Sequence, residues 1–201
     1  RAERIRGGGV SASVDNMLKV TNDGRKLALD QRMIDPLLPD EHDSKVNACV
    51  GEVYRIWSET ADQKSAQLLF CDLSTPKSDG SFNVYDDIRK KLIARGIPAD
   101  EIKFIHEADT EAKKQELFKK VRRGEVRVLI GSTAKMGAGT NVQNKLIASH
   151  DLDCPWRPSD LEQRAGRTVR QGNENPVVGL YRYVTEETFD AYLYQLVEGK
   201  Q

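Results

Sequence analysis

The sequence predicts an α/β protein with a doubly wound parallel sheet and helices on both faces. Short apolar segments alternate with segments of helical periodicity along most of the chain, as in parallel strands joined by crossover helices. The composition indicates a folded domain, since 38% of the 201 residues are apolar and 31% are charged. Its 31 basic and 31 acidic side chains give a net charge of zero, which excludes a histone-like polycation. No stretch approaches the ~20 apolar residues of a membrane span.

The first 43 residues are predicted to be an irregular extension, because glycines and prolines interrupt their short apolar pieces. The folded domain is expected over 44–201. It begins with apolar residues at helical spacing from 46 to 57, after a capping residue at Asp43 or Ser44, which predicts a helix to about Thr60. The sequence AQLLFCD at 66–72 then predicts the first buried strand.

The same alternation continues to the end of the chain. The predicted helices have apolar residues three and four apart, and glycines such as Gly124 end them. Ser159 and Glu162 fit a capping box at the start of one helix. The remaining predicted elements are a helix over 84–92, a strand over 102–105, a helix over 110–123, strands over 126–130 and 146–152, a helix from 159, a strand over 177–184 and a helix over 188–198.

The cysteines and histidines do not predict a metal site. They are Cys49, Cys71 and Cys154, and His42, His106 and His150. An odd number of widely spaced cysteines fits neither a disulfide framework nor a Cys-x-x-Cys pair, and the histidines have no partner at ligand spacing. We therefore expect a reducing, cytoplasmic location, and the absence of an apolar leader agrees with it. Because the chain does not begin with Met, we expect it to be a segment of a longer protein.

A polar, glycine-containing loop, GSTAKMGAGTN at 131–141, follows the strand predicted at 126–130. Loops at the carboxyl ends of parallel strands commonly hold ligands. Gly137 and Gly139 would allow a phosphate to approach the backbone closely, and Asn141 offers an amide. The same residues also fit a simple strand-to-helix turn.

Two arginines near the end of the helix predicted from 159 are candidates for phosphate binding. Arg167 and Arg170 are three residues apart and are expected to share one helical face, with Gln163 on the same side. One guanidinium group can bind two phosphate oxygens at once, and it stays charged at any working pH. The alternative is a solvated helix in which Asp160 and Glu162 pair with these arginines.

These segments resemble the motifs of superfamily-two helicases, in family order. The sequence QRAGRTVR at 163–170 matches motif VI, Q-x-x-G-R-x-x-R, at every defined position. The segment 132–142 is similar to motif V of the Swi/Snf-like branch, commonly S-T-R-A-G-G-x-G-I-N-L. Its matching residues are Ser132, Thr133, Gly137, Gly139 and Asn141.

Two further segments resemble the same branch. DLDCPWRP at 151–158 resembles D-x-x-W-N-P, with Arg157 in place of Asn, and QLLFC at 67–71 resembles the L-I-F-S strand of motif IV. Gly166 stands where the Swi/Snf-like branch often has Asp, as in helicases generally. The resemblance covers about 45–173 and extends more weakly to 198.

The resemblance implies the second RecA-like lobe of an ATP-dependent helicase or translocase. In such a lobe Arg167 and Arg170 would be arginine fingers that act on ATP held by a first lobe. Residues with an implied role in nucleotide binding are Gln163, Gly137, Gly139 and Asn141. Residues with an implied role in binding the nucleic-acid backbone, double-stranded DNA being favoured, are Ser74, Thr75, Thr133 and Lys135.

The sequence lacks the G-x-x-x-x-G-K-[S/T] loop that cradles nucleotide phosphates. We therefore expect that this chain alone does not hydrolyse ATP, and that ATP and Mg²⁺ bind only in an intact protein with an N-terminal RecA-like lobe. Asp40, Glu41 and His42 imitate the acidic motif II, but we expect them to form a surface turn.

Other interpretations remain open at this point. The segment 15–25 resembles the connector from a first lobe, as in phage or mobile-element proteins that fuse a DNA methyltransferase to a helicase. A different class of function is a non-catalytic RecA-like module that binds nucleic acid or protein. A small α/β enzyme would need a nucleophile or base, and no Ser/His/Asp or Cys/His arrangement is evident.

Overall fold

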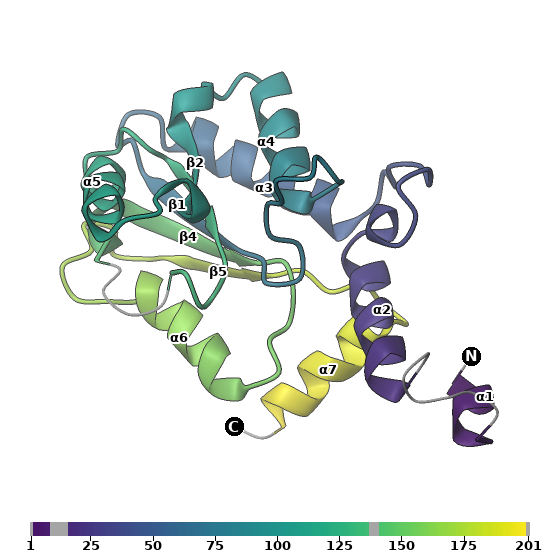
Figure 1. Cartoon of the computed structure of the whole chain (residues 1–201). Helices are drawn as coiled ribbons and strands as arrows, with labels where there is room; N and C mark the ends of the chain where they lie inside the picture. The colour runs from purple at the N-terminus through teal and green to yellow at the C-terminus, as the bar shows by residue number, and fades with distance from the viewer. Residues whose placement is uncertain (1, 9–15, 137–140, 200–201) are drawn as a thin grey trace.

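The computed structural model describes residues 2–8, 16–136 and 141–199. Its centre is a parallel sheet of five strands in the order β2-β3-β1-β4-β5 (Figure 1). The strands are β1 (Ala66–Phe70), β2 (Ile102–Phe104), β3 (Val128–Gly131), β4 (Leu146–Asp151) and β5 (Gly179–Arg182). The predicted α/β class with a parallel sheet is confirmed.

Helices α3 (Lys45–Glu59) and α4 (Val84–Ala94) cover one face of the sheet. The Ser44 hydroxyl accepts a hydrogen bond from the Asn47 amide at 3.1 Å and so caps α3, one of the two caps expected from the sequence. Asn83 caps α4 in the same way, through the Asp86 amide. Leu69 of β1 packs among the apolar residues of these helices, whereas its neighbour Leu68 faces the other side.

Helices α5 (Glu111–Arg122) and α6 (Pro158–Thr168) lie on the opposite face, and α7 (Phe189–Glu198) packs against α6. Gly124 ends α5 with a φ of +72°, as its position after the predicted helix requires. A Cβ at Gly124 would lie 2.6 Å from the carbonyl oxygen of Lys64, so no larger residue fits. The predicted pair of helical layers is therefore present.

The N-terminal region differs from the irregular extension that the sequence predicts. It contains the short helix α1 (Ala2–Arg6) and the 13-residue helix α2 (Met17–Leu29), which is capped by Asn16. Helix α2 packs beside α7 (Figure 1), and a Cβ at Gly24 would lie 3.8 Å from the Cβ of Phe189. Contact with α7 therefore offsets the low helix propensity of the sequence Asn-Asp-Gly at 22–24.

Smaller differences occur at the ends of elements. Helix α6 begins at Pro158, and no side chain caps it, so the predicted capping box at Ser159 and Glu162 is wrong. Proline suits the first helical position because its missing N–H would have no partner there. The predicted strand at 177–184 is paired only over 179–182. Among the described residues, no helix is long and apolar enough to cross a bilayer.

Candidate functional site

The candidate site lies at the carboxyl edge of the sheet, where three loops meet (Figure 1). These are the loop after β1, the loop after β3 and the segment between β4 and α6. In a parallel sheet such loops emerge on the same side, so residues far apart in sequence become neighbours. The described residues of the sequence predictions, at 74–75, 132–136 and 163–170, fall in or next to this region.

Arg164 on α6 joins the three loops. Its side chain is fully buried and lies over the ring of Phe70, 5.3 Å from the ring centre. Its Nε donates to Thr133 Oγ1 at 2.8 Å. Nη1 donates to Asp151 Oδ1 at 3.2 Å and to the carbonyl oxygen of Asp153 at 2.8 Å. Nη2 donates to Asp72 Oδ2 at 2.8 Å and to Asp153 Oδ1 at 3.0 Å, so all five N–H groups of the guanidinium have acceptors.

The carboxylates around Arg164 also bind the backbone of the loops. Asp153 Oδ2 accepts from the amides of Asp72 and Leu73, at 2.6 and 2.7 Å. Asp72 accepts from the amide of Thr133 at 2.6 Å and from its hydroxyl at 2.8 Å. The loops after β1, β3 and β4 are therefore joined by one hydrogen-bonded network.

The charges in this network depend on one another. Burial alone would lower the pKa of Arg164, but the three surrounding carboxylates outweigh burial and raise it above its ordinary value. Burial raises the pKa of Asp151, while the charge of Arg164 opposes that shift. Arg164 therefore stays charged in the interior, and its positive charge compensates the negative charges of the surrounding carboxylates.

The residues predicted to bind nucleotide lie next to Arg164 on α6 and just beyond the end of the helix. Gln163 and Arg170 are exposed, and Arg167 is half-buried. Gln163 and Arg167 lie on one helical side, as predicted, whereas Arg170 follows the end of α6 at Thr168 and is not part of that helical face. The Nε of Arg167 is buried and has no hydrogen-bond partner among the described residues. Burial, together with the nearby charge of Arg170, lowers the pKa of Arg167.

The four predicted nucleic-acid contacts fall into two pairs. The Ser74 hydroxyl accepts from the amide of Val84 at the start of α4, at 2.8 Å, and the Thr133 hydroxyl is bound within the Arg164 network. Thr75 is partly exposed and Lys135 is exposed. Thr75 and Lys135 thus have side chains open to solvent, and the role of all four stays a prediction.

The glycine-containing loop is only partly described. Gly137 and Gly139 lie outside the described residues. Asn141 is exposed, and its carbonyl oxygen accepts from Arg122 Nη1. The nucleotide contacts predicted for these three residues stay predictions.

The acidic sequence at 40–42 forms an exposed turn, as expected. Asp40 approaches Asp30 and Asp87 closely enough to suggest a metal site. However, Arg32 Nη2 lies among these carboxylates, at 2.7 Å from Asp30, 2.9 Å from Asp87 and 3.2 Å from Asp40. The arginine occupies the position that a cation would take, so the group is an ion-pair cluster.

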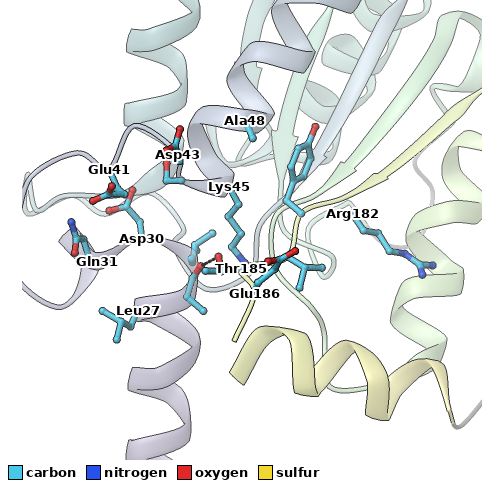
Figure 2. A pocket seen from close by; sticks show the side chains of 15 residues that line it. Leu27, Asp30, Gln31, Glu41, Asp43, Lys45, Ala48, Arg182, Thr185 and Glu186 are labelled. Carbon is cyan, nitrogen blue, oxygen red and sulfur yellow. Dashed lines mark hydrogen bonds between the residues drawn. The ribbon is translucent and has the colours of Figure 1, made fainter. Parts of the chain in front are cut away.

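A separate groove of about 870 Å³ lies between the end of α2, the start of α3 and the residues after β5 (Figure 2). Lys45, labelled in Figure 2, points from α3 toward residues 185 and 186. Its Nζ is paired with Asp190 Oδ2 at 2.7 Å, and both side chains are buried. None of the arginines of α6 lines this groove, so it is distinct from the candidate site.

Arg164 and its three aspartates are the residues that sequence reasoning missed. Asp72, Asp151 and Asp153 follow or end two of the predicted strands. Acidic residues at the carboxyl ends of two strands, together with an arginine on the following helix, were the available signal. The distances between them depend on strand order, which the sequence pattern did not specify.

Comparison with known proteins places this geometry among helicases. Residues 58–172 match the family described as helicase conserved C-terminal domain. Over 89 residues the chain is 37% identical to an uncharacterized ATP-dependent helicase, YqhH, of Bacillus subtilis strain 168, which covers 43% of this chain and 15% of that protein.

Solved structures share the fold. The C-terminal part of the Fun30 ATPase domain superposes with a TM-score of 0.58 at 20% identity, covering 80% of this chain and 48% of that one. The DUF1998 helicase MrfA bound to DNA superposes with a TM-score of 0.50 at 16% identity, covering 73% of this chain and 20% of that one. The chain thus spans less than half the length of these relatives.

Proposed function

Because the chain belongs to the helicase conserved C-terminal domain family, we propose that it is the second motor lobe of an ATP-dependent DNA helicase or translocase. In this proposal an N-terminal RecA-like lobe of the same polypeptide binds ATP and Mg²⁺. The present chain closes against the nucleotide and contributes Arg167 and Arg170. It does not hydrolyse ATP alone, because its sequence has no phosphate-binding loop.

The observation that carries the proposal is the contrast between Arg164 and Arg167 on α6. Arg164 is fully buried among its aspartates and anchors α6, whereas Arg167, three residues later, is only half-buried. The buried Nε of Arg167 has no acceptor among the described residues. A phosphate oxygen is an acceptor of the kind this group lacks. Arg167, Arg170 and Gln163 therefore fit a nucleotide held by a facing lobe.

Arginine side chains at such a position stabilise negative charge as a phosphoryl group is transferred. ATP would supply the phosphoryl group that is transferred, and Mg²⁺ would neutralise part of the phosphate charge. Arg167 and Arg170 would bind the phosphate oxygens in the transition state, and Gln163 would orient them. Arginine fingers of this type contribute about 10³–10⁵ in rate.

Nucleic acid is the proposed track for the motor. Lys135 and Thr75 lie at the same sheet edge with side chains open to solvent, and contacts to phosphates suit a protein that moves along any sequence. The structure of MrfA, which shares the fold, contains DNA. We favour double-stranded DNA because of the Swi/Snf-like segments at 132–142 and 151–158. The subfamily and a mobile-element origin stay proposals of the same kind.

The test is substitution of Arg170 in the full-length two-lobe protein. Arg170→Ala should abolish DNA-stimulated ATP hydrolysis and leave DNA affinity within about twofold, since charge at the transition state is lost but the phosphate-tracking residues remain. Arg123→Ala, which removes an exposed arginine at the end of α5, is the matched control and should keep wild-type turnover. Unchanged hydrolysis by Arg170→Ala would overturn the assignment. DNA binding without any ATP hydrolysis by the wild-type protein would instead indicate a non-catalytic binding module.

A further inference from the structure

Arg25 on α2 reaches across the molecule to the segment that leads into α6. Its side chain is buried, and Nη2 donates to the carbonyl oxygen of Cys154 at 2.7 Å. The guanidinium carbon lies 4.7 Å from the centre of the Trp156 ring. One arginine thus holds two positions of the β4–α6 segment, 129 residues or more away in sequence.

The segment held by Arg25 is adjacent to the Arg164 network. Cys154 follows Asp153 directly, and Asp153 binds Arg164 through both its carboxylate and its carbonyl oxygen. Helix α6 begins four residues after Cys154, at Pro158. Asp153 and Arg25 therefore fix neighbouring peptide groups, and together they define where α6 starts.

Helix α2 is itself held firmly enough to serve as an anchor. The Thr185 hydroxyl donates to the carbonyl oxygen of Ala28 at 2.7 Å. A Cβ placed at Gly24 would lie 3.8 Å from the Cβ of Phe189, so α2 and α7 approach closely there, and the buried Lys45–Asp190 pair fixes the start of α7 against α3. Arg25 therefore projects from a helix packed on both α7 and the residues after β5.

We infer that Arg25 is a positioning residue for the motor reaction. By holding Cys154 and Trp156 it sets the start of α6, and through α6 it sets where Arg167 and Arg170 stand against the nucleotide. Arg25 does not touch the nucleotide in this account. The inference rests on the proposed function, and it makes the N-terminal helix part of the catalytic arrangement.

The experiment compares variants of α2 in the full-length two-lobe protein. Arg25→Ala should lower kcat for DNA-stimulated ATP hydrolysis about 10- to 100-fold, the effect of a small misplacement of catalytic groups, with KM for ATP changed less than about twofold. Arg25→Lys keeps a donor for the Cys154 carbonyl and should recover part of the loss. Lys26→Ala, which removes a charge from the neighbouring position of the same helix, is the control and should keep wild-type kcat.

Two further measurements separate positioning from general stability. In the 201-residue chain with Trp57→Phe, which leaves Trp156 as its one tryptophan, the emission of Trp156 should shift to the red in Arg25→Ala, because its ring loses the guanidinium that lies over it. In an Arg167→Lys background, Arg25→Ala should lower kcat by a much smaller factor than in the wild type, since both changes act through the same groups. The inference would be overturned if Arg25→Ala lowered kcat by the same factor in the wild type and in Arg167→Lys, or if the Trp156 emission did not change.

The outcomes distinguish the two proposals. If Arg170→Ala leaves turnover unchanged, the proposed function fails. If Arg170→Ala abolishes turnover but Arg25→Ala and Arg25→Lys both keep wild-type kcat, only the positioning role fails. If Arg25→Ala does not fold, Arg25→Lys and Trp156→Leu carry the test, because each weakens the same contact. Wild-type kcat in both would overturn the inference.

Discussion

Arg164 and Arg167 carry the same type of side chain on α6 but have different surroundings. Arg164 faces inward, is fully buried and has acceptors for all five of its N–H groups. Arg167, three residues later, is half-buried, and its buried Nε has no hydrogen-bond partner among the described residues. The difference teaches that partners, rather than residue type, decide the role of an arginine. The first holds loops together, and the second is the arginine for which we propose a role in nucleotide binding.

The strongest way to break this comparison is to remove Arg164. Arg164→Ala should destabilise the protein by about 3–5 kcal/mol, because buried carboxylates of Asp151 and Asp153 lose their counter-charge. The measurement is the free energy of unfolding in urea. Arg164→Lys should recover only part of this energy, since an ammonium group has three donors where five are used. A loss below about 1 kcal/mol would show that the network does not hold the loops.

His150 offers a second comparison with Arg164. It is buried on the other side of the sheet, but no oppositely charged group among the described residues contacts it. It precedes Asp151 on β4, is fully buried and stacks on Tyr181 and Tyr183. Burial lowers the pKa of His150 to about 3, and the charge of Glu52 opposes the shift. The imidazole is therefore neutral, in contrast to the charged Arg164.

The tautomer of His150 follows from its partners. The Gln67 side-chain amide donates to the carbonyl oxygen of Val53, so Gln67 Oε1 accepts from His150 Nε2 at 2.9 Å. Nδ1 then accepts from the Tyr183 hydroxyl at 2.8 Å. A proton added at Nδ1 would oppose the hydroxyl donor. This geometry agrees with a lowered pKa.

Acidification should therefore unfold the protein partly through His150. Its folded pKa is below its unfolded value of 6.5, so its contribution to stability is present above pH 6.5 and is lost as pH falls toward 3. Between pH 6.5 and 5 the loss should be about 2 kcal/mol. Urea unfolding at each pH measures it, with His150→Gln as control. An equal pH dependence in that variant would contradict the assignment.

Substitution of Thr133 tests whether this residue stabilises the Arg164 network or serves as a nucleic-acid contact. Thr133→Val keeps the shape of the side chain but removes the acceptor for Arg164 Nε and the donor to Asp72 Oδ2. We expect a loss of about 1–2 kcal/mol in the free energy of unfolding. Thr75→Val, at a partly exposed position, should change it by less than about 0.5 kcal/mol. The reverse order would place Thr133 outside the network.

The sequence predicted the fold well where signals were local. The cap at Ser44 lies directly before the helix that it starts, and Gly124 lies directly after the helix that it ends. Helix α2 was not predicted because its stability depends on α7, far along the chain. The cap at Ser159 failed because Pro158 already occupies the first helical position.

The same distinction between local signals and contacts between distant residues applies to the candidate site. Motif spacing singles out Gln163, Arg167 and Arg170, whose roles stay predictions, because these residues lie close together in the sequence. It did not find the role of Arg164, because its acceptors lie on three separate loops and its burial depends on how β1, β3 and β4 are ordered. Arg25 was missed for the same reason, since its partners are at 154 and 156.

The smallest expected change in stability comes from Arg167. Arg167→Ala removes a half-buried side chain whose Nε has no acceptor and whose charge is opposed by Arg170. The free energy of unfolding should therefore change by less than about 0.5 kcal/mol, while ATP turnover of the two-lobe protein falls by about 10³ or more. Arg164→Ala, three residues away on the same helix, should instead cause a large loss of stability. If Arg167→Ala instead cost more than about 2 kcal/mol, Arg167 would have a structural partner, and the contrast between Arg164 as a structural residue and Arg167 as a proposed nucleotide-binding residue would not hold.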